Sequence, residues 1–398
     1  MSEYAKINGI DAADIVKIDG IEKASAAKVL GLDTPSASGA TLWAFGMKSS
    51  GSSSYYHIGR AAASDLTSWT IDRAIADADI SGTASDETYR ICYGKDASGN
   101  PRWVTCAASG NPEVRYGVVT DSGVSGWGTV NMNNRIRSVA YSEYSGSHVW
   151  MAIGHMGSST KDTFRSTDGG ESWSTIDLSS VANMGTQNIY RIATDGAGTF
   201  VFGQQNRVYA STDGGQNWAQ IASYPGIAIA DLCYTTVSGA GVWFFLEGDG
   251  SVCDVHSVNA SDVTTEAGGG SAATWRTSDI IDGNTDTIVT YQNSSRCAAA
   301  NGIAIIHNTS NSFAWTLSTS AAPAVLGTKT LIGTSGHAQC ISGSPDGTWL
   351  IGEKGNSAGG KIHRSTDNGA NWAEVAASLE RDNAKEIEDI APDVVLPF

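Results

Sequence analysis

The residues of this chain best able to do chemistry are aspartates that recur in one eight-residue motif. The motif reads STDGGESW over residues 166–173, and it returns as STDGGQNW ending at Trp218 and as STDNGANW ending at Trp372. Such carboxylates could ligate a metal ion or act as catalytic acids. However, an aspartate also accepts hydrogen bonds from the N–H groups of its own turn, and glycine permits a positive φ. Because turn chemistry explains the motif, we predict no catalytic, cofactor-binding or metal-binding residue in it.

Looser copies of the motif extend along most of the chain. VTDSGVSGW is one residue longer, SDLTSW is one shorter, NTSNSFAW has Ser310 at the aspartate position, and SDVTTE has Asp262 with Glu266 in place of tryptophan. Successive copies end 45 to 58 residues apart, a period typical of β-propellers. We predict that the aspartates fix hairpin turns and that the tryptophans fold back as apolar plugs between sheets. These structural residues are Asp65, Asp121, Asp168, Asp213, Asp367, Trp69, Trp127, Trp173, Trp218, Trp315 and Trp372.

A second set of aromatic residues supports the repeat. Tryptophans lie 23 to 26 residues before the end of their copy of the motif, and a phenylalanine takes this place in one repeat. They are Trp43, Trp103, Trp150, Trp243, Trp349 and Phe200. This regular recurrence favours core packing over sugar stacking, and it leaves only Trp275 outside the pattern.

A third set places a cysteine or an alanine in the strand before each aromatic strand. Its members are Cys92, Ala140, Ala193, Cys233 and Cys340. We prefer a packing role at a crowded hub over thiol chemistry, because no histidine–cysteine arrangement indicates a nucleophile. None of the six cysteines forms a CxxC pair or a cluster with zinc spacing. We therefore expect reduced thiols made inside a cell, with disulfides as the less favoured alternative.

The three sets together predict an all-β chain with seven blades of four strands over roughly residues 41–378. The blade at about 287–320 is the least regular, with Cys297 in either its first or its second strand. The first blade lacks an inner strand, while residues 386–396 resemble the inner strand of another blade, with Ala391 in the small-residue position. We therefore predict a propeller domain over 41–398, in which the C-terminal strand completes blade 1 and closes the ring.

Residues 1–40 form a separate N-terminal arm with a different repeat. KINGI, KIDGI and KVLGL begin at Lys6, Lys17 and Lys28, so their spacing is 11 residues. Each unit could be a short strand with a glycine turn, although the filler between the units favours helix, and a disordered tail is the simplest alternative. The arm is too short to bury a core of its own. We therefore expect it to order on a partner or to self-associate.

Composition excludes several functions. The chain of 398 residues has 25 Lys+Arg against 41 Asp+Glu and a net charge of −16. Such a chain lacks the basic stripe needed to bind nucleic acid or anionic lipid. No apolar stretch is long enough to span a membrane, and the N-terminus has no secretory signal pattern.

The motif S-x-D-x-G-x-x-W resembles the Asp-box, or BNR, repeat of sialidase-like β-propellers. The match is close in the copies ending at Trp173, Trp218 and Trp372, and it implies a seven-bladed Asp-box β-propeller. That family includes glycosidases, receptors and binding proteins, so the resemblance is specific for fold and not for function. The KINGI/KIDGI arm resembles N-terminal segments of virion proteins from tailed bacteriophages. Together the two resemblances imply a phage structural protein anchored by its arm, with the propeller displayed.

A sialidase-like hydrolase is the main alternative function. The resemblance implies an arginine cluster, and Arg90, Arg137 and Arg191 lie near the starts of inner strands. However, the family's Phe-Arg-Ile-Pro opening is absent, and no Tyr–Glu pair stands out on an inner strand. We therefore expect a non-enzymatic protein of the virion, synthesised in the host cytoplasm, as part of a tail fibre, a tailspike or a capsid-attached fibre.

The expected binding surface consists of loops on one face of the propeller. They are residues 49–56, 154–157 and 356–360, rimmed by the connections 73–88 and 267–286. Gly/Ser/Tyr-rich loops on a rigid scaffold suit recognition of a host surface glycan or protein. The arm would contact other virion proteins or further copies of the chain. A purely structural spacer or decoration is the third hypothesis.

Overall fold

The computed structural model describes most of the propeller and short pieces of the arm. The described residues are 6–7, 10–11, 17–18, 21–22, 40–49, 55–76, 88–107, 113–154, 162–185, 189, 191–221, 229–237, 239–247, 254–270, 275–279, 295–300, 302–308, 311–318, 325–332, 337–356, 359–380 and 384–394. The chain divides into two compact units, Met1–Ser38 and Gly39–Phe398. No helix among the described residues is long and apolar enough to cross a bilayer.

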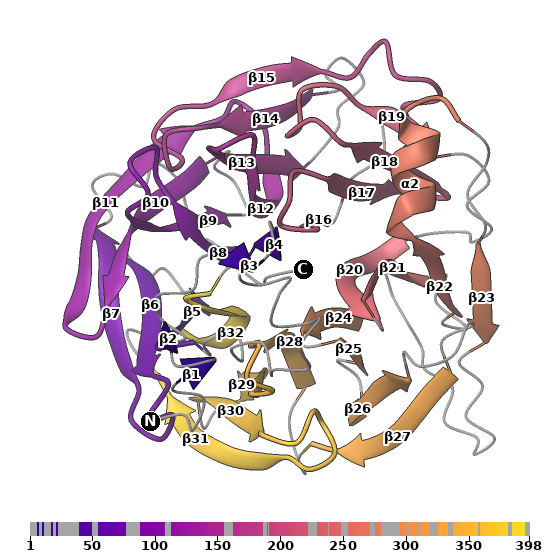
Figure 1. Ribbon diagram of the computed structural model, residues 1–398. Coiled ribbons are helices and arrows are strands. Elements are labelled where there is room, and N and C mark those ends of the chain that lie inside the picture. Colours follow the sequence, from indigo (N-terminus) through magenta and orange to yellow (C-terminus); the bar gives the residue numbers. More distant parts are fainter. Residues whose placement is uncertain are drawn as a thin grey trace. The chain divides into compact units, whose positions relative to one another are not determined.

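The second unit consists, over the residues described, of seven four-stranded antiparallel blades, and Figure 1 shows them arranged around a common axis. Blade 1 has β5 (Leu42–Ser49), β6 (Tyr55–Ala62) and β7 (Thr70–Ala76), and blade 2 has β8 (Thr88–Lys95), β9 (Pro101–Ala107), β10 (Glu113–Thr120) and β11 (Gly123–Asn131). Blade 3 has β12 (Ile136–Tyr144), β13 (Ser147–Gly154), β14 (Asp162–Ser166) and β15 (Ser174–Asp177), and blade 4 has β16 (Ile192–Thr194), β17 (Phe200–Gln204), β18 (Arg207–Ser211) and β19 (Ala219–Ile221). Blade 5 has β20 (Ile229–Val237), β21 (Ala240–Glu247), β22 (Asp254–Asn259) and β23 (Arg276–Asp279), and blade 6 has β24 (Ser295–Ala300), β25 (Ile303–Asn308), β26 (Asn311–Ser318) and β27 (Val325–Leu331). Blade 7 has β28 (His337–Gly343), β29 (Trp349–Asn356), β30 (Gly359–Ser365) and β31 (Ala373–Leu379).

The C-terminal strand β32 (Ala384–Pro392) supplies the inner strand of blade 1 by pairing antiparallel with β5. Ala391 lies opposite Ala44, and the Asp393 carboxylate accepts hydrogen bonds from the N–H groups of Thr41 (2.8 Å) and Leu42 (2.9 Å). A single pairing of Lys354 with Glu386 also connects β32 to blade 7. The first and the last strands of the propeller are therefore adjacent, as the sequence predicts.

Large aromatic side chains on the second strand of the blades fill the spaces between neighbouring blades. The five tryptophans of this set and Phe200 are all 0% exposed. Trp150 shows how tightly they pack, because a Cβ atom on Gly94 of blade 2 would lie 2.7 Å from its ring. The Trp150 indole N–H also donates to the carbonyl of Lys95, at 2.9 Å. The aromatic set therefore belongs to the core.

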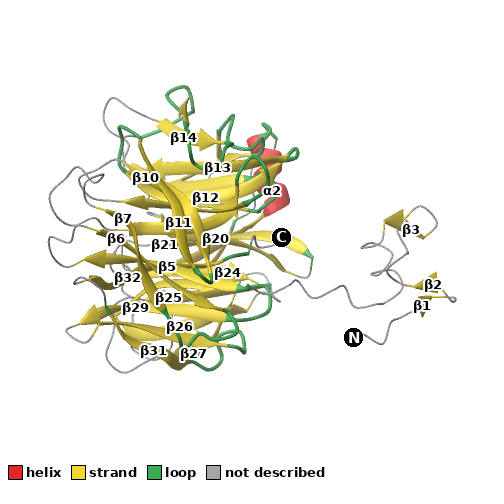
Figure 2. Cartoon of the chain, turned by 90° about the vertical axis from the view of Figure 1, so that its left-hand side faces the viewer, coloured by secondary structure: helices red, strands yellow, loops and turns green. Residues whose placement is uncertain are grey.

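In blade 5 the prediction of a turn at Asp262 with Glu266 in the tryptophan position is wrong. Helix α2 (Ala260–Ala267) occupies this connection, and Figure 2 shows it at the edge of the propeller. Trp275, which the sequence left outside the pattern, takes the plug position instead. Its ring lies 5.2 Å from that of Phe245 on β21, and the motif tryptophan Trp218 lies in the same way 4.8 Å from Phe202 on β17. Because the connection through α2 is longer than the other turns, the spacing of the motif did not identify Trp275 as the equivalent of the motif tryptophans.

In blade 6 the assignment of Trp315 as a motif tryptophan is also wrong. Trp315 lies inside the third strand, β26, opposite Ile306 and Lys329, and does not precede the fourth strand. Asn308 pairs with Asn311 at the junction of the second and third strands. Ser310 lies outside the described residues. The blade runs over 295–331, displaced from the predicted 287–320, with Cys297 in its first strand.

In the arm, two of the three repeats contain short hairpins. β1 (Lys6–Ile7) pairs with β2 (Ile10–Asp11), and β3 (Lys17–Ile18) pairs with β4 (Ile21–Glu22). Each pairing places a lysine opposite an acidic residue, Lys6 with Asp11 and Lys17 with Glu22. This is the strand-and-turn interpretation of the repeat. The third repeat, at residues 28–32, lies outside the described residues.

Candidate functional site at the propeller hub

A β-bulge at the same place in several inner strands directs one polar side chain from each blade to the hub. The pairing registers shift just before Asp389, Arg90, Ser138, Asp231 and Cys340 in blades 1, 2, 3, 5 and 7. Bulges commonly re-aim a side chain in this way. Arg191 and Arg296 occupy the same position in blades 4 and 6. We call these seven residues the hub ring.

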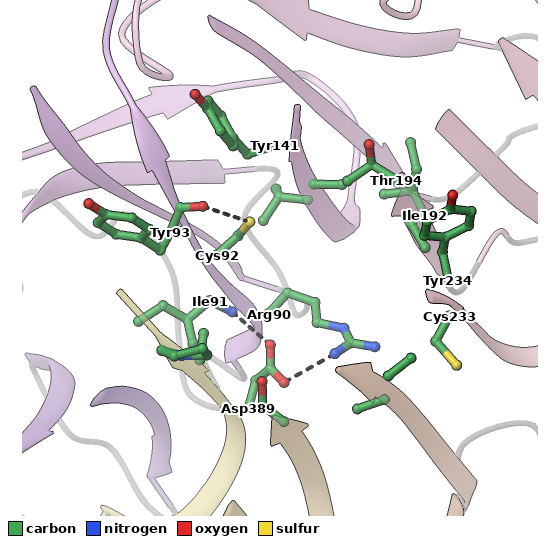
Figure 3. A pocket seen from close by; sticks show the side chains of 18 of the residues that line it. Arg90, Ile91, Cys92, Tyr93, Tyr141, Ile192, Thr194, Cys233, Tyr234 and Asp389 are labelled. Carbon is green, nitrogen blue, oxygen red and sulfur yellow. Dashed lines mark hydrogen bonds and ion pairs between the residues drawn. The ribbon is translucent and has the colours of Figure 1, made fainter. Parts of the chain in front are cut away.

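Ion pairs of the hub ring connect blades across the axis. Arg90 lies 3.1 Å from Asp389 of blade 1 and 3.4 Å from Asp231 of blade 5, while Arg191 of blade 4 lies 3.1 Å from Asp231. The Asp231 side chain is 0% exposed, and Figure 3 shows Arg90 extended toward Asp389. Of the predicted arginines, the structure brings together Arg90 and Arg191. Arg90 lines the hub cavity described below, whereas Arg137 and Arg191 do not.

The hub ring also holds the backbone of the next blade. The N–H of Ile91 in blade 2 donates to Asp389 (2.9 Å), and the N–H of Cys297 in blade 6 donates to Asp231 (3.2 Å). In the same position, the N–H of Ile192 in blade 4 donates to the Ser138 hydroxyl (3.3 Å). Blades 1, 3 and 5 therefore each provide the oxygen that fixes the inner strand of the following blade. This regularity connects the blades in pairs.

Above the hub ring lies a cavity of about 230 Å³. Its wall includes one small residue from every blade, two positions after the hub ring residue: Ala391, Cys92, Ala140, Ala193, Cys233, Ala298 and Ser342. The prediction of Cys340 in this set is wrong. Ser342 pairs with Leu350 beside Trp349, as Cys92 pairs with Val104 beside Trp103, so Cys340 lies two positions earlier. The hairpin of blade 7 is shorter than that of blade 2, because Gly343 pairs with Trp349 while Tyr93 pairs with Trp103.

Burial controls the charge of the groups around this cavity. It raises the pKa of the Cys92 thiol to about 12, and the charge of Asp389 acts in the same direction. Burial also lowers the pKa of Arg191 to about 9, with Arg90 and Arg296 contributing repulsion. At neutral pH the Cys92 thiol is therefore protonated and Arg191 remains charged. A protonated thiol is a poor nucleophile.

One polar cluster at the hub was missed by the sequence prediction. The Tyr141 hydroxyl lies 3.2 Å from a Glu143 oxygen and 2.7 Å from His148 Nδ1, and Lys95 pairs with Glu143 at 2.9 Å. Tyr141 and Glu143 alternate along β12, so a Tyr-x-Glu pattern on an inner strand was the available signal. Burial raises the pKa of Tyr141, and the negative charge of Glu143 raises it further. The phenol is therefore held in its protonated form.

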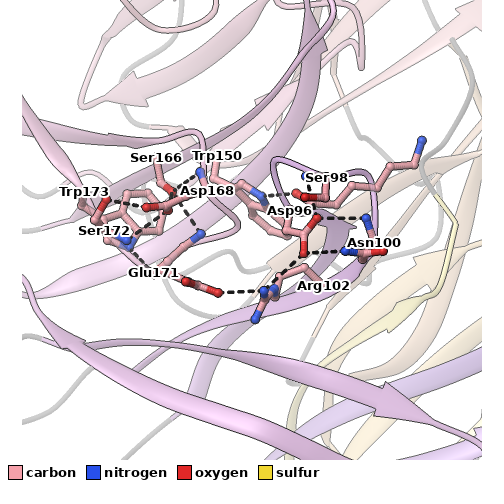
Figure 4. A network of polar contacts seen from close by, with 12 residues as sticks. Asp96, Ser98, Asn100, Arg102, Trp150, Ser166, Asp168, Glu171, Ser172 and Trp173 are labelled. Atoms are coloured by element: carbon pink, nitrogen blue, oxygen red, sulfur yellow. Dashed lines mark hydrogen bonds and ion pairs between the residues drawn. The ribbon is translucent and has the colours of Figure 1, made fainter.

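The motif aspartates lie far from this chemistry, in turns between the third and fourth strands. The Asp168 carboxylate accepts hydrogen bonds from Ser166 Oγ (2.7 Å) and the N–H of Ser172 (3.0 Å), and the Trp173 indole N–H donates to the carbonyl of Gly170 (2.9 Å), as Figure 4 shows. Gly170 has a φ of 88°, which glycine adopts without strain. Asp213 and Asp367 hold their turns in the same way, through Asn217 and Asn371.

Two of the looser copies, those of Asp65 and Asp121, differ from this geometry. Asp65 accepts from the N–H of Thr67 at 3.1 Å, and the Trp69 indole donates to the carbonyl of Leu66 at 2.8 Å, which keeps the pattern in a shorter turn. Asp121 is exposed in the two-residue turn between Thr120 and Gly123. Trp127 covers Gly117 from within β11, because a Cβ there would lie 2.5 Å from the indole.

Much of the predicted binding surface lies outside the described residues. These parts of the proposed loops are residues 50–54, 77–87, 155–157, 271–274, 280–286 and 357–358. Within the part that is described, no group of three or more His, Cys, Asp or Glu side chains could hold a metal ion.

Comparisons with known proteins give one short family match and several solved structures of low sequence identity. Residues 164–175 match the BNR/Asp-box repeat family, and no curated protein matches the chain. YCF48 from Cyanidioschyzon merolae shares 16% identity over 73% of this chain and 85% of that chain, with a TM-score of 0.47. The structure of YCF48 bound to D1 peptide shares 13% over 73% and 81% (TM-score 0.47), and Saccharomyces cerevisiae Sqt1 shares 11% over 72% and 74% (TM-score 0.48). From its turn geometry, its repeated four-stranded sheets and the family match, the chain is an Asp-box β-propeller.

Proposed function

We propose that this chain is a non-enzymatic structural protein of a bacteriophage virion, part of a tail fibre, a tailspike or a capsid-attached fibre. The arm attaches to other virion proteins, and the propeller is displayed for contact with the host surface. The observation that carries the attachment role is the pair of hairpins β1–β2 and β3–β4. A hairpin of two-residue strands is at best marginally stable alone in water. A repeated hairpin of this kind therefore gains its stability from a partner surface.

The hub chemistry supports a binding or structural role over catalysis. Arg90 and Arg191 are engaged by Asp231 and Asp389, and Tyr141 and Cys92 are held protonated. Most glycosidases need a carboxyl pair that can exchange protons with substrate, and in sialidases a tyrosine replaces the nucleophilic carboxylate. The hub carboxylates instead hold arginines and the N–H groups of neighbouring blades.

Particle composition tests the proposal. Mass spectrometry of purified particles should detect the chain, and the double variant Ile7→Asp/Ile18→Asp should reduce incorporation by roughly tenfold or more, because each charge removes apolar contact area. The matched control Thr175→Asp, on the exposed outermost strand of blade 3, should be incorporated normally. Particles that lack the chain, or that incorporate the double variant fully, would contradict an arm-anchored virion protein.

Host contact is tested separately. Excess purified full-length chain should compete with particles for adsorption to the host. Incorporation without competition would favour the spacer or decoration hypothesis.

The sialidase-like hydrolase is the alternative, because the structure brings Arg90 and Arg191 together and pairs Tyr141 with Glu143. We expect no turnover of fluorogenic sialosides or other glycosides. Measurable turnover that Tyr141→Phe abolishes would favour the hydrolase over the binding protein.

A further inference from the structure

Two cysteines from adjacent blades meet at the wall of the hub cavity. Cys233 lies on β20 of blade 5 and Cys297 on β24 of blade 6, and both line the cavity. Each is 7% exposed, and both belong to one apolar cluster with Phe244 and Ile306. Figure 3 shows the Cys233 sulfur at the cavity wall. Both thiols are free.

The two thiols are close neighbours. Their strands, β20 and β24, pack side by side, and both side chains belong to the same apolar cluster at the cavity wall. Burial raises the pKa of Cys297, and the neighbouring Cys233 thiol raises it further. The backbone near them is also fixed, because the N–H of Cys297 donates to Asp231, two residues before Cys233. The inner strands of blades 5 and 6 are therefore held together where the thiols meet.

No other cysteine in the described part of the chain has this arrangement. Cys92 lines the same cavity, but the small residues of the adjacent blades at its level are Ala391 and Ala140. Cys106 and Cys340 are each 1% exposed and do not line the cavity. Cys92 therefore lines the hub cavity, as Cys233 and Cys297 do, but has no cysteine at its level in the adjacent blades. It serves as an internal control.

We propose that Cys233 and Cys297 form an oxidation site, at which a small peroxide that enters the hub cavity joins blades 5 and 6 through a disulfide. In the first step one thiol attacks hydrogen peroxide, giving a sulfenic acid and water. In the second, the neighbouring thiol displaces the hydroxyl of the sulfenic acid, giving the disulfide and a second water. Two sulfur atoms are oxidised and the two peroxide oxygens are reduced, so no other reactant is needed.

The reaction is slow but its product is stabilising. Burial raises the pKa of Cys297 far above its ordinary value, so the thiolate needed for the first step is scarce. Once formed, the disulfide closes a long loop of the unfolded chain and lowers its entropy. A protein made with reduced thiols inside a cell would thus become locked after release into an oxidising medium.

Peptide mapping of the full-length native protein tests the proposal. After incubation with hydrogen peroxide, remaining thiols are alkylated with N-ethylmaleimide under denaturing conditions and the digest is analysed without reduction. We expect a Cys233–Cys297 cross-linked peptide, alkylated Cys106 and Cys340, and Cys92 either alkylated or oxidised alone. The oxidised protein should also melt roughly 5 °C higher, and dithiothreitol should reverse the shift.

Two variants distinguish the pair from general oxidation. Cys297→Ala should abolish both the cross-link and the melting shift, and it should leave a sulfenic acid at Cys233 that dimedone traps. Cys92→Ala should change neither result, and alanine already occupies this position in four other blades. Recovery of both Cys233 and Cys297 as alkylated thiols after Cys92 has been oxidised would overturn the proposal. So would a cross-link of either residue to any other cysteine in the folded protein.

Discussion

Blades 4 and 5 are neighbours, and in each of them an indole packs on the second strand. They differ in the segment that joins the third strand to this indole. In blade 4 the Asp213 turn places Trp218 4.8 Å from Phe202, while in blade 5 helix α2 leads to Trp275, 5.2 Å from Phe245. The fold therefore preserves the packing of the indole on the second strand, and the Asp-box turn is one of two ways to reach it. A motif search detects the turn and misses the packing.

The same two blades also differ at the hub. Blade 4 provides Arg191, whereas blade 5 provides Asp231, which is fully buried and accepts hydrogen bonds from the N–H groups of Leu232 (2.9 Å) and Cys297 (3.2 Å). Blade 4 is thus fixed by its turn at the rim, and blade 5 by its carboxylate at the hub.

The largest expected effect is the loss of the blade 5 carboxylate. Asp231→Ala removes a partner from Arg90 and Arg191 and leaves buried charge uncompensated, so it should lower the free energy of unfolding by about 3–5 kcal/mol. Guanidinium unfolding measures this, and Asp231→Asn, which keeps an oxygen acceptor, should lose less. A loss below about 1 kcal/mol would show that blade 5 does not depend on its hub.

Removal of either indole tests whether the two connections are equivalent. Trp218→Ala and Trp275→Ala should each cost about 2–4 kcal/mol, because each leaves a void over an aromatic ring of the second strand. Thermal and urea unfolding would give both values. If Trp275→Ala is neutral while Trp218→Ala is costly, the assignment of Trp275 as a plug is wrong.

A smaller difference is expected at the two aspartates. Asp213→Ala should cost about 1–2 kcal/mol, because it removes the acceptor of the turn's N–H groups. Asp262→Ala in the first turn of α2 should change stability by less than about 1 kcal/mol, since only a helix-dipole interaction and a long, exposed hydrogen bond from Ser261 (3.5 Å) are lost. If the two substitutions lower the free energy of unfolding equally, Asp262 also stabilises a turn through hydrogen bonds.

The smallest expected effect is a pH dependence at the blade 4 turn. Burial raises the pKa of Asp213, but hydrogen bonds from Asn217 and Ser211 more than offset this, so its pKa lies below the ordinary value. A depressed pKa stabilises the fold above the unfolded pKa of about 4, and this contribution is lost as pH falls below it. The difference in melting temperature between the wild type and Asp213→Asn should therefore shrink from pH 6 to pH 3. If the difference in melting temperature stays constant over this pH range, the charge of Asp213 does not stabilise the turn.

The accuracy of the sequence prediction followed the range of each interaction. The turn role was predictable for Asp168, Asp213 and Asp367, because the N–H group that donates to each carboxylate lies only four residues further along the chain. Trp315 was misassigned because an aromatic residue after a polar turn occurs in a third strand as well as before a fourth. Cys340 was misplaced because the hairpin between β28 and β29 is short: Gly343 pairs with Trp349, whereas in blade 2 Tyr93 pairs with Trp103.

The amino-acid sequence alone determined the four-stranded repeat and the buried aromatic strands, because turn chemistry and apolar periodicity are local. It also indicated the pairing of the C-terminal strand with blade 1, because residues 386–396 resemble the inner strand that blade 1 lacks. Only the tertiary structure decided the hub. Arg90 meets Asp389 across 299 residues and Asp231 across 141, and such partners are set by how the strands pack around the axis. The proximity of Cys233 to Cys297 has the same origin, since it exists only where two inner strands lie side by side.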